Sequence, residues 1–424
     1  MISTFLQRLK QSDLLRNSST LILGTVFAQL IPILFQPLLR RMFSAEAFGT
    51  AALYITAVGM LVAIANLKYE SAVVLPEKDQ EARSIVSGAV WISAVFSIVC
   101  FAFIFFNKGR IGSYFELNAT ESWYLHFLPI SVFFVSSFQC FNYYLIRKKA
   151  YKASARNKVY RRGAEALVQS STGLGKYSSG LLLGNLMGDV VNFFGGYRQA
   201  KHEGFRFSWN FTEIKQSLQS HWQFPVFHAL PSFLNTISLT LPVFIVNAVF
   251  GKAETGQFDL SRMVLSLPMA LISIALSQVY LQHQAEKIRA KASIISDLKK
   301  VSFGLLALSL PLATILYFFA GPLFQFAFGQ QWELAGQLTA ILVFGQSLKF
   351  VVSPLSSTLV ALKEVRFSAF WQILYFGAML YLYLHPGKDM FEFVGRYCVI
   401  DLIAYAVYYG LIYAVVWQYE NKRG

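Results

Sequence analysis

Residues 17–49 read NSSTLILGTVFAQLIPILFQPLLRRMFSAEAFG, and this stretch decides the fold of the chain. Its apolar part is about twenty residues long, which is enough to cross the ~30 Å hydrocarbon core of a bilayer as a helix. Gln29, Gln36 and Arg40 are spaced so that a helix places them on one face. Two prolines interrupt the backbone hydrogen bonding, which a spanning helix tolerates where neighbours or a wet cavity satisfy the freed groups. The stretch therefore predicts a membrane helix with a polar, kinked face that lines a cavity.

The composition indicates an integral membrane protein. The 424 residues are 55% hydrophobic and only 14% charged, whereas a soluble domain carries roughly a quarter charged residues. The net charge of +15 also suits a nucleic-acid binder, but the positions of the basic residues explain it by membrane topology. The three cysteines, Cys100, Cys140 and Cys398, lie in apolar runs without metal or redox spacing. We interpret them as small hydrophobic residues.

Hydropathy predicts an all-α protein with twelve membrane-spanning helices. The expected spans are 18–39, 47–66, 84–106, 123–145, 160–174, 179–197, 223–249, 257–281, 301–320, 335–361, 367–384 and 396–417. The fifth is the most polar of them, because Glu165 and Gln169 lie within it. The longest polar break, near residues 200–222, divides the chain into two six-helix lobes, which we expect at residues 1–203 and 204–424.

The basic residues predict the orientation of the chain. The connections on the side of the two termini carry roughly three times as many Lys and Arg as those on the other side, and such an excess marks the cytoplasmic face. Both termini are therefore expected in the cytoplasm. The halves also look related, because RRMFSAEAFG after the first span is echoed by VFGKAETG after the seventh. Six spans per half predict a parallel repeat, which is common among transporters.

Several motifs resemble polysaccharide flippases of the Wzx type. They are the basic lead-in that ends in Asn17-Ser18, the turn after the first span, the stretch LKYESAVVLP at 67–76 and the pattern FGxxWxxAG at 328–336. That family belongs to the multidrug/oligosaccharidyl-lipid/polysaccharide (MOP) exporter superfamily. The resemblance implies two lobes around a central cavity and a multi-pass location in the bacterial inner membrane.

The resemblance also implies a function. A Wzx-type protein moves undecaprenyl-diphosphate-linked oligosaccharide from the cytoplasmic to the periplasmic leaflet, for O-antigen (lipopolysaccharide), capsule or exopolysaccharide synthesis. The expected partners are this lipid-linked substrate, the bilayer and polysaccharide polymerase machinery, with no nucleic acid. A monomer is expected, since a bilobed cavity needs no second chain. No cofactor is expected, while coupling to a Na+ or H+ gradient is left open.

Ionisable groups within the spans are the first candidates for function, because they are costly in hydrocarbon and usually face a cavity or a partner. In the sixth span, Asn185, Asp189 and Asn192 share one face. Asp189 is either a buried, ion-paired residue or, with its two neighbours, an ion-coupling site. Lys349 lies deep in the tenth span. It either contacts the substrate diphosphate or pairs with Asp189 or Asp401.

Further polar residues complete the predicted substrate site. They are Arg40, Gln36 and Gln29 of the first span, His228 and Asn235 of the seventh, and Gln346 of the tenth. Arg40 either faces the mouth of the cavity or reaches the outer headgroups, and His228 is either a cavity residue or a packing residue. Gly180, Gly184 and Gly188 form a small-residue ridge that we interpret as helix packing.

Two other functions remain to be weighed. A multidrug or cation-coupled extruder of the same superfamily shares the expected fold. A membrane glycan polymerase or ligase is less favoured, because such enzymes need a substantial outer loop with catalytic Arg or His and the outer connections here are short. Soluble catalytic motifs and metal-binding His pairs are absent from the sequence. We therefore predict a transporter rather than an enzyme.

Overall fold

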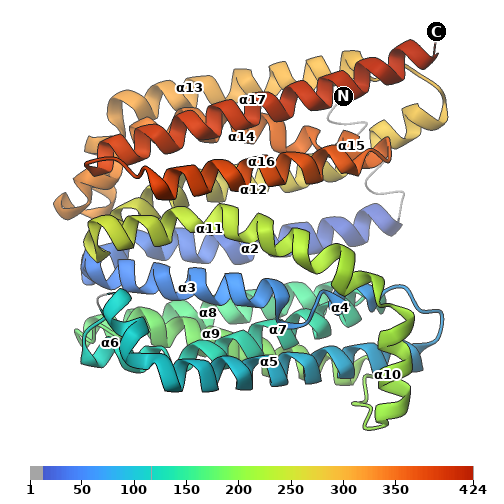
Figure 1. Cartoon of the computed structure of the whole chain (residues 1–424), viewed down its shortest axis with the longest axis horizontal. Helices are drawn as coiled ribbons and strands as arrows, with labels where there is room; N and C mark the ends of the chain where they lie inside the picture. The colour runs from blue at the N-terminus through green and yellow to red at the C-terminus, as the bar shows by residue number, and fades with distance from the viewer. Residues whose placement is uncertain (1–12, 116, 424) are drawn as a thin grey trace. The chain divides into compact units, whose positions relative to one another are not determined.

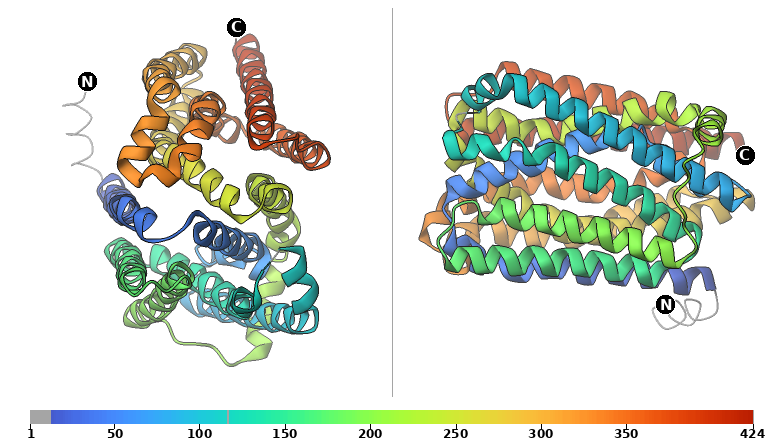
Figure 2. Two further views of the ribbon diagram at one scale, coloured as in Figure 1. Left: turned by 90° about the vertical axis from the view of Figure 1, so that its left-hand side faces the viewer. Right: turned by 90° about the horizontal axis from the view of Figure 1, so that it is seen from below.

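The computed structural model describes residues 13–115 and 117–423, and within these ranges it contains helices and connecting turns but no strand (Figure 1). The chain divides into two compact units, Met1–Thr236 and Ile237–Gly424. Each unit is a bundle of long helices, which Figure 2 shows end on in its left-hand view. The predicted all-α membrane fold is thus confirmed.

The described part of unit 1 contains six long helices and four shorter ones. They are α2 (Asp13–Met42), α3 (Ala45–Ala65), α4 (Tyr69–Ala72), α5 (Asp79–Tyr114), α6 (Ala119–Tyr124), α7 (Phe127–Arg147), α8 (Tyr151–Leu174), α9 (Gly180–His202), α10 (Phe211–Ser220) and the π-helix η1 (Pro225–Ala229). The packing runs from α2 to α8, α9, α7 and then α5. Tyr69, Val73 and Cys140 are buried in the apolar core that joins α4, α5 and α7. The LKYESAVVLP stretch therefore serves as a core segment, and Cys140 behaves as a small hydrophobic residue.

Unit 2 contains five long helices and most of a sixth. They are α11 (Leu230–Phe250), which begins before the division, α12 (Lys252–Arg289), α13 (Ile295–Phe328), the 3-10 turn η2 (Gln330–Trp332), α14 (Glu333–Leu355), α15 (Ser357–Ala361), α16 (Val365–Leu384) and α17 (Met390–Arg423). Helix α14 packs against α12, α13 and α17. Of its most apolar window, 67% of the residues are buried, against 22% for α13, so α14 forms the centre of this unit.

The membrane-spanning character of the chain is confirmed. Among the described residues, nine helices are long and apolar enough to cross a bilayer. Helices α8 and α9, which match the fifth and sixth predicted spans, are not among the nine, because polar side chains lower their hydropathy. Helix α8 also begins at Tyr151, earlier than the residue 160 expected, and so it includes basic residues that the sequence had suggested were a loop.

The structure divides the chain after Thr236, whereas the sequence suggested a division after residue 203. The reason is that α10 folds back onto unit 1. The Tyr69 hydroxyl donates to the backbone oxygen of Leu218 at 3.1 Å, and Gln80 donates to the Glu213 carboxylate at 3.1 Å. The polar break is therefore part of unit 1 rather than a free linker.

Polar residues at the helix ends fix several of the turns. The Ser44 side chain accepts from the Ala47 N–H at 3.2 Å and so caps α3, which explains the FSAE turn. Lys149, Lys291 and Lys363 follow helix C-termini with φ of 56°, 52° and 61°. This is the left-handed conformation that closes a helix end and usually favours glycine. A lysine also complements the negative end of the helix dipole, and this adds basic residues to the connections.

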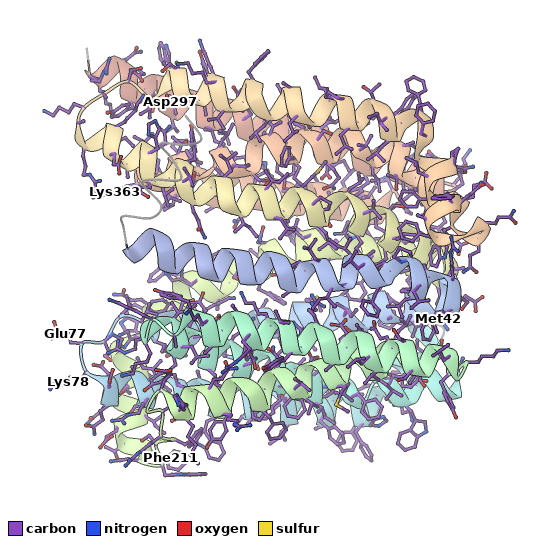
Figure 3. All side chains as sticks on the ribbon, turned by 180° about the vertical axis from the view of Figure 1, so that it is seen from behind. Met42, Glu77, Lys78, Phe211, Asp297 and Lys363 are labelled. Carbon is purple, nitrogen blue, oxygen red and sulfur yellow. The ribbon has the colours of Figure 1, made fainter. Side chains whose placement is uncertain are left out.

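The two ends of each unit can be followed in Figure 3. In unit 1, Glu77, Lys78 and Phe211 lie at one end and Met42 lies at the other. In unit 2, Asp297 and Lys363 lie together at one end of that bundle. Within each unit, the connections predicted to share a side of the membrane therefore do lie at one end of the bundle.

Candidate functional site

Side chains of α8 and α7 pair with polar side chains on one face of α9. Arg161 Nη2 of α8 lies 2.9 Å from Asp189 Oδ1, and the Asp189 side chain is only 5% exposed. On its other side Asp189 accepts a hydrogen bond from Ser131 of α7, which in turn accepts from the Tyr54 hydroxyl at 3.0 Å. Asp189 is thus buried and ion-paired, while ion coupling through this residue stays a prediction. Its partner Arg161 was not foreseen, because the fifth span was expected to begin close to it.

The two asparagines of this face make different bonds. Asn157 Nδ2 of α8 donates to both the backbone oxygen and Oδ1 of Asn192, at 2.9 and 2.7 Å. Asn185 Nδ2 donates to the Leu181 oxygen of its own helix at 2.9 Å. Both asparagines are buried. The predicted face is therefore real, and Asn192 contributes to the joint between α8 and α9.

The glycine ridge of α9 lets this joint form. A Cβ on Gly184 would lie 2.3 Å from Gln169 Cγ and 3.0 Å from the Glu165 backbone oxygen. A Cβ on Gly180 would meet the Thr172 hydroxyl at 2.2 Å. No larger residue fits while the backbones stay this close, which supports the packing interpretation.

Arg40, at the end of α2, is buried. Its guanidinium carbon lies 3.6 Å from the centroid of the Phe48 ring, and its Nε donates to Gln36 Oε1 at 3.0 Å. It is 1% exposed, so it does not reach out to headgroups as one interpretation suggested. Gln36 and Gln29 are half-buried, and among the described residues Gln29 Oε1 has no hydrogen-bond partner.

The seventh predicted span begins with the π-helix η1. His228 lies in η1, is exposed, and stacks on Phe224 with 5.1 Å between ring centroids. Asn235, in α11, is half-buried. Because π-helical bonds run from i to i+5, regular α-helical spacing does not hold between His228 and Asn235. Short π segments inside helices are frequent at functional sites.

The centre of unit 2 holds a cluster of ionisable and aromatic side chains. Lys349 of α14 is half-buried, with its Nζ 5.5 Å from the centroid of the Tyr405 ring. Asp401 of α17 is 1% exposed and accepts from the Tyr375 hydroxyl at 2.7 Å. Asp401 and Arg262 both act electrostatically on Lys349. Yet no carboxylate of the described chain lies within the 4.0 Å of a salt bridge to this lysine.

Neighbouring residues fix the geometry of this cluster. Arg262 Nη2 of α12 donates to the Leu239 oxygen at 2.8 Å, and its guanidinium lies 5.5 Å from the centroid of the Phe258 ring. Gly345 lets α14 approach α17, because its Cβ would lie 3.1 Å from the Asp401 Cβ. Gln346, one residue on, is buried. The cluster therefore contains two basic side chains, Lys349 and Arg262, and one acidic side chain, Asp401, which is hydrogen-bonded to Tyr375.

The tyrosines of this cluster were not predicted as site residues. A signal was available, since Tyr397, Asp401, Tyr405 and Tyr408 follow one another at helical spacings of three or four. The abundance of aromatic residues throughout the chain concealed it. Among the described residues, no group of three or more His, Cys, Asp or Glu side chains is placed to hold a metal ion.

Comparisons with known proteins identify the family of this chain and the solved structures that share its fold. The model of a family described as "Polysaccharide biosynthesis protein" matches residues 38–336. No curated protein matches the chain. A solved lipid II flippase MurJ, in an inward closed conformation, is similar in fold with a TM-score of 0.76 and 12% identity, covering 92% of this chain and 86% of the other.

Two further structures share the fold. An inward-facing multidrug resistance MATE family transporter of the MOP superfamily has a TM-score of 0.71 and 13% identity, over 93% of this chain and 96% of the other. A MOP superfamily transporter from Pyrococcus furiosus has a TM-score of 0.58 and 14% identity, over 96% and 95%. The resemblance drawn from the sequence motifs is thereby confirmed, and the chain belongs to the polysaccharide biosynthesis protein family as a multi-pass membrane protein with the fold of MOP superfamily transporters.

Proposed function

We propose that this protein is a flippase for lipid-linked oligosaccharide. It would move undecaprenyl-diphosphate-linked repeat units from the cytoplasmic to the periplasmic leaflet of a bacterial inner membrane by alternating access, with both termini in the cytoplasm. The observation that carries the proposal is the match to the polysaccharide biosynthesis family over residues 38–336. The product would supply surface polysaccharide synthesis, and the protein would act as a transporter rather than as a polymerase or ligase.

Lys349 is the proposed contact for the diphosphate. An unpaired ammonium is costly in a medium of low dielectric, and an anionic ligand offsets that cost. Asp401 is already held by the Tyr375 hydroxyl, and Arg262 adds a second positive charge to the surroundings of the lysine. Lysine suits a phosphate as a point charge on a flexible stem. These features support Lys349 as an anion-binding residue.

The other predicted residues would serve the glycan and the driving force. Gln346 lies one turn before Lys349 on α14, and the amide groups of Gln29, Gln36 and Asn235 are suited to hydrogen-bond sugar hydroxyls. Arg40 and His228 stay proposed substrate contacts, and Arg40 would have to leave its contacts with Phe48 and Gln36 to act as one. Coupling to a Na+ or H+ gradient through Asp189, Asn185 and Asn192 is the least supported element, because the Asp189 carboxylate is already bound by Arg161.

A multidrug extruder is the second candidate. The observation that favours it is the fold shared with the MATE family transporter. A drug-binding pocket for cationic compounds favours acidic and aromatic residues, and unit 2 contains aromatic residues around Asp401. Sensitivity of a deletion strain to cationic dyes separates this candidate from the flippase.

The decisive experiment measures the leaflet in which lipid-linked oligosaccharide resides, with a glycosidase that acts only from the periplasmic side. Membranes that lack the protein should protect the glycan, and the wild-type protein should expose it. Lys349→Met should remove this exposure while retaining membrane insertion, and Lys349→Arg should restore part of it. Lys300→Met is the matched control, because Lys300 is an exposed lysine of the same unit. Equal glycan exposure with and without the protein would refute the flippase proposal.

A further inference from the structure

A second basic site lies at one end of unit 1, apart from Lys349. A pocket of about 1200 Å³ is formed by the turn between α7 and α8, the first half of α8 and the last turns of α9. On α8, Lys152, Arg156 and Tyr160 follow one another at spacings of four and so share one face. On α9, Arg198 and His202 face the same pocket. The volume is sufficient for a lipid headgroup, because small-molecule pockets measure roughly 300–1,000 Å³.

Four cations of this pocket have no ion-pair partner among the residues that the structure describes. Lys149, Lys152, Arg156 and Arg198 form no ion pair with any carboxylate in the described part of the chain. The one acidic residue of the lining, Glu203, has His202 Nδ1 at 3.7 Å.

Three basic residues just outside the pocket are paired with carboxylates. Arg147 and Lys148 both bind Asp79, and Arg161 binds Asp189. The pocket therefore gathers four basic side chains against one acidic residue, Glu203, and such a positive excess is the electrostatic requirement of an anion site.

Aromatic residues place this pocket at the level of the lipid headgroups. After α9 the chain runs along α5, where the Ser208 N–H donates to Ser87 Oγ at 2.9 Å. The ring centroids of Trp209 and Trp91 lie 5.9 Å apart. Trp209 is 69% exposed, and Phe211, two residues later in the chain, is 63% exposed. Exposed tryptophans collect at the membrane–water interface. Figure 3 shows Phe211 at the same end of unit 1 as Glu77 and Lys78, and this is the end that the basic residues assign to the cytoplasm.

We propose that the pocket formed by Lys149, Lys152, Arg156 and Arg198 binds the phosphate of an anionic phospholipid headgroup in the cytoplasmic leaflet. Basic pockets between membrane helices on the cytoplasmic side bind such headgroups. Four positive charges suit a phosphodiester at the bilayer surface, and Tyr151 and Tyr160 of the lining supply amphipathic rings. The diphosphate of a polyprenyl carrier offers related chemistry, and the test separates the two sources.

The test measures lipid binding to the purified full chain in neutral detergent by native mass spectrometry. The probes are short-chain phosphatidylglycerol, phosphatidylcholine and a short polyprenyl diphosphate. The test variant is the double change Arg156→Gln/Arg198→Gln. The matched control is Arg206→Gln/Lys215→Gln, which removes two exposed charges from the same end of unit 1 outside the pocket. Size-exclusion profiles and thermal unfolding check the fold of both variants, and the single exposed change Lys152→Gln gives a milder version.

The wild-type chain should bind phosphatidylglycerol in preference to phosphatidylcholine. Each basic residue near an anionic lipid surface contributes ~1 kcal/mol. Because the test variant removes two of them, it should lose affinity for phosphatidylglycerol by a factor of roughly thirty. Lys152→Gln should lose a smaller factor, and the control should stay close to wild type. Three outcomes would each overturn the proposal. The control could lose as much affinity as the test variant, or the wild-type chain could show no preference for phosphatidylglycerol over phosphatidylcholine. In the third outcome, only the binding of the polyprenyl diphosphate would depend on Arg156 and Arg198. None of these outcomes depends on transport, so the proposed function is tested separately.

Discussion

The ion pair between Arg161 and Asp189 allows the two interpretations of Asp189 to be tested against each other. The two side chains are 2.9 Å apart, and their exposed fractions are 29% and 5%. Removing one partner of a buried pair costs about 3–5 kcal/mol, because the other charge is left buried and unpaired. Arg161→Met leaves the more buried group unpaired, so we expect a loss of about 3 kcal/mol in the free energy of unfolding. Asp189→Asn should cost about 2 kcal/mol, since the partly exposed arginine regains some water.

The double variant Arg161→Met/Asp189→Asn contains no buried unpaired charge. Its loss of unfolding free energy should therefore fall below the sum of the two single losses by about 2 kcal/mol, within the range seen for residues in direct contact. Equilibrium unfolding in mixed micelles measures all four proteins. The exposed pair Arg366 and Glu364, 2.7 Å apart, is the control. Its coupling energy should stay below about 1 kcal/mol.

Additive losses, equal to the sum within about 0.5 kcal/mol, would refute the conclusion that the pair fixes α8 against α9. The same four proteins answer the functional question. If the double variant regains stability and also exposes the glycan, then Asp189 is structural. If it regains stability without glycan exposure, the carboxylate itself is needed, and the ion-coupling proposal gains support.

Three other predictions concern packing, backbone and pH. Gly184→Val should lower the unfolding free energy by about 1–3 kcal/mol, because the new side chain overlaps Gln169. Gly59→Ala is the control and should not destabilise the protein, because a Cβ at Gly59 has nothing within 4 Å. Thermal unfolding in detergent compares the two variants. Lys363→Gly should raise the unfolding free energy by about 1 kcal/mol by relieving its left-handed backbone, in the same assay. Burial raises the pKa of the Glu70 carboxyl above its usual range. The free energy of unfolding should therefore fall as the pH rises from the usual pKa of a glutamate to the raised pKa of Glu70 in the folded protein. Glu70→Gln should remove this dependence when unfolding is measured against pH.

The sequence predicted the elements of the fold because each signal for them is local. A run of apolar residues marks a span wherever it packs, and the spacing of Asn185, Asp189 and Asn192 correctly predicted a buried polar face. The partner of Asp189 could not be predicted, since Arg161 reaches it only through the packing of α8 on α9. The division after Thr236 was not predicted for the same reason. The sequence of α10 resembles a polar linker, and only its contacts with α5 show that it belongs to unit 1. Pairing between distant segments, rather than the identity of the segments, was the missing information.

This pairing also ranks the two charged candidates for function. A cation that binds Asp189 must displace a guanidinium held at 2.9 Å in a largely buried site, and the displaced Arg161 would then lose its own partner. Lys349 presents the opposite case, because its nearest acid is already held by Tyr375 and no salt bridge within the described chain neutralises it. A bound diphosphate would therefore remove an existing electrostatic penalty at Lys349, whereas a bound cation would create one at Arg161. On this reasoning we propose Lys349 of α14, rather than Asp189, as the charged residue that an anionic substrate would contact.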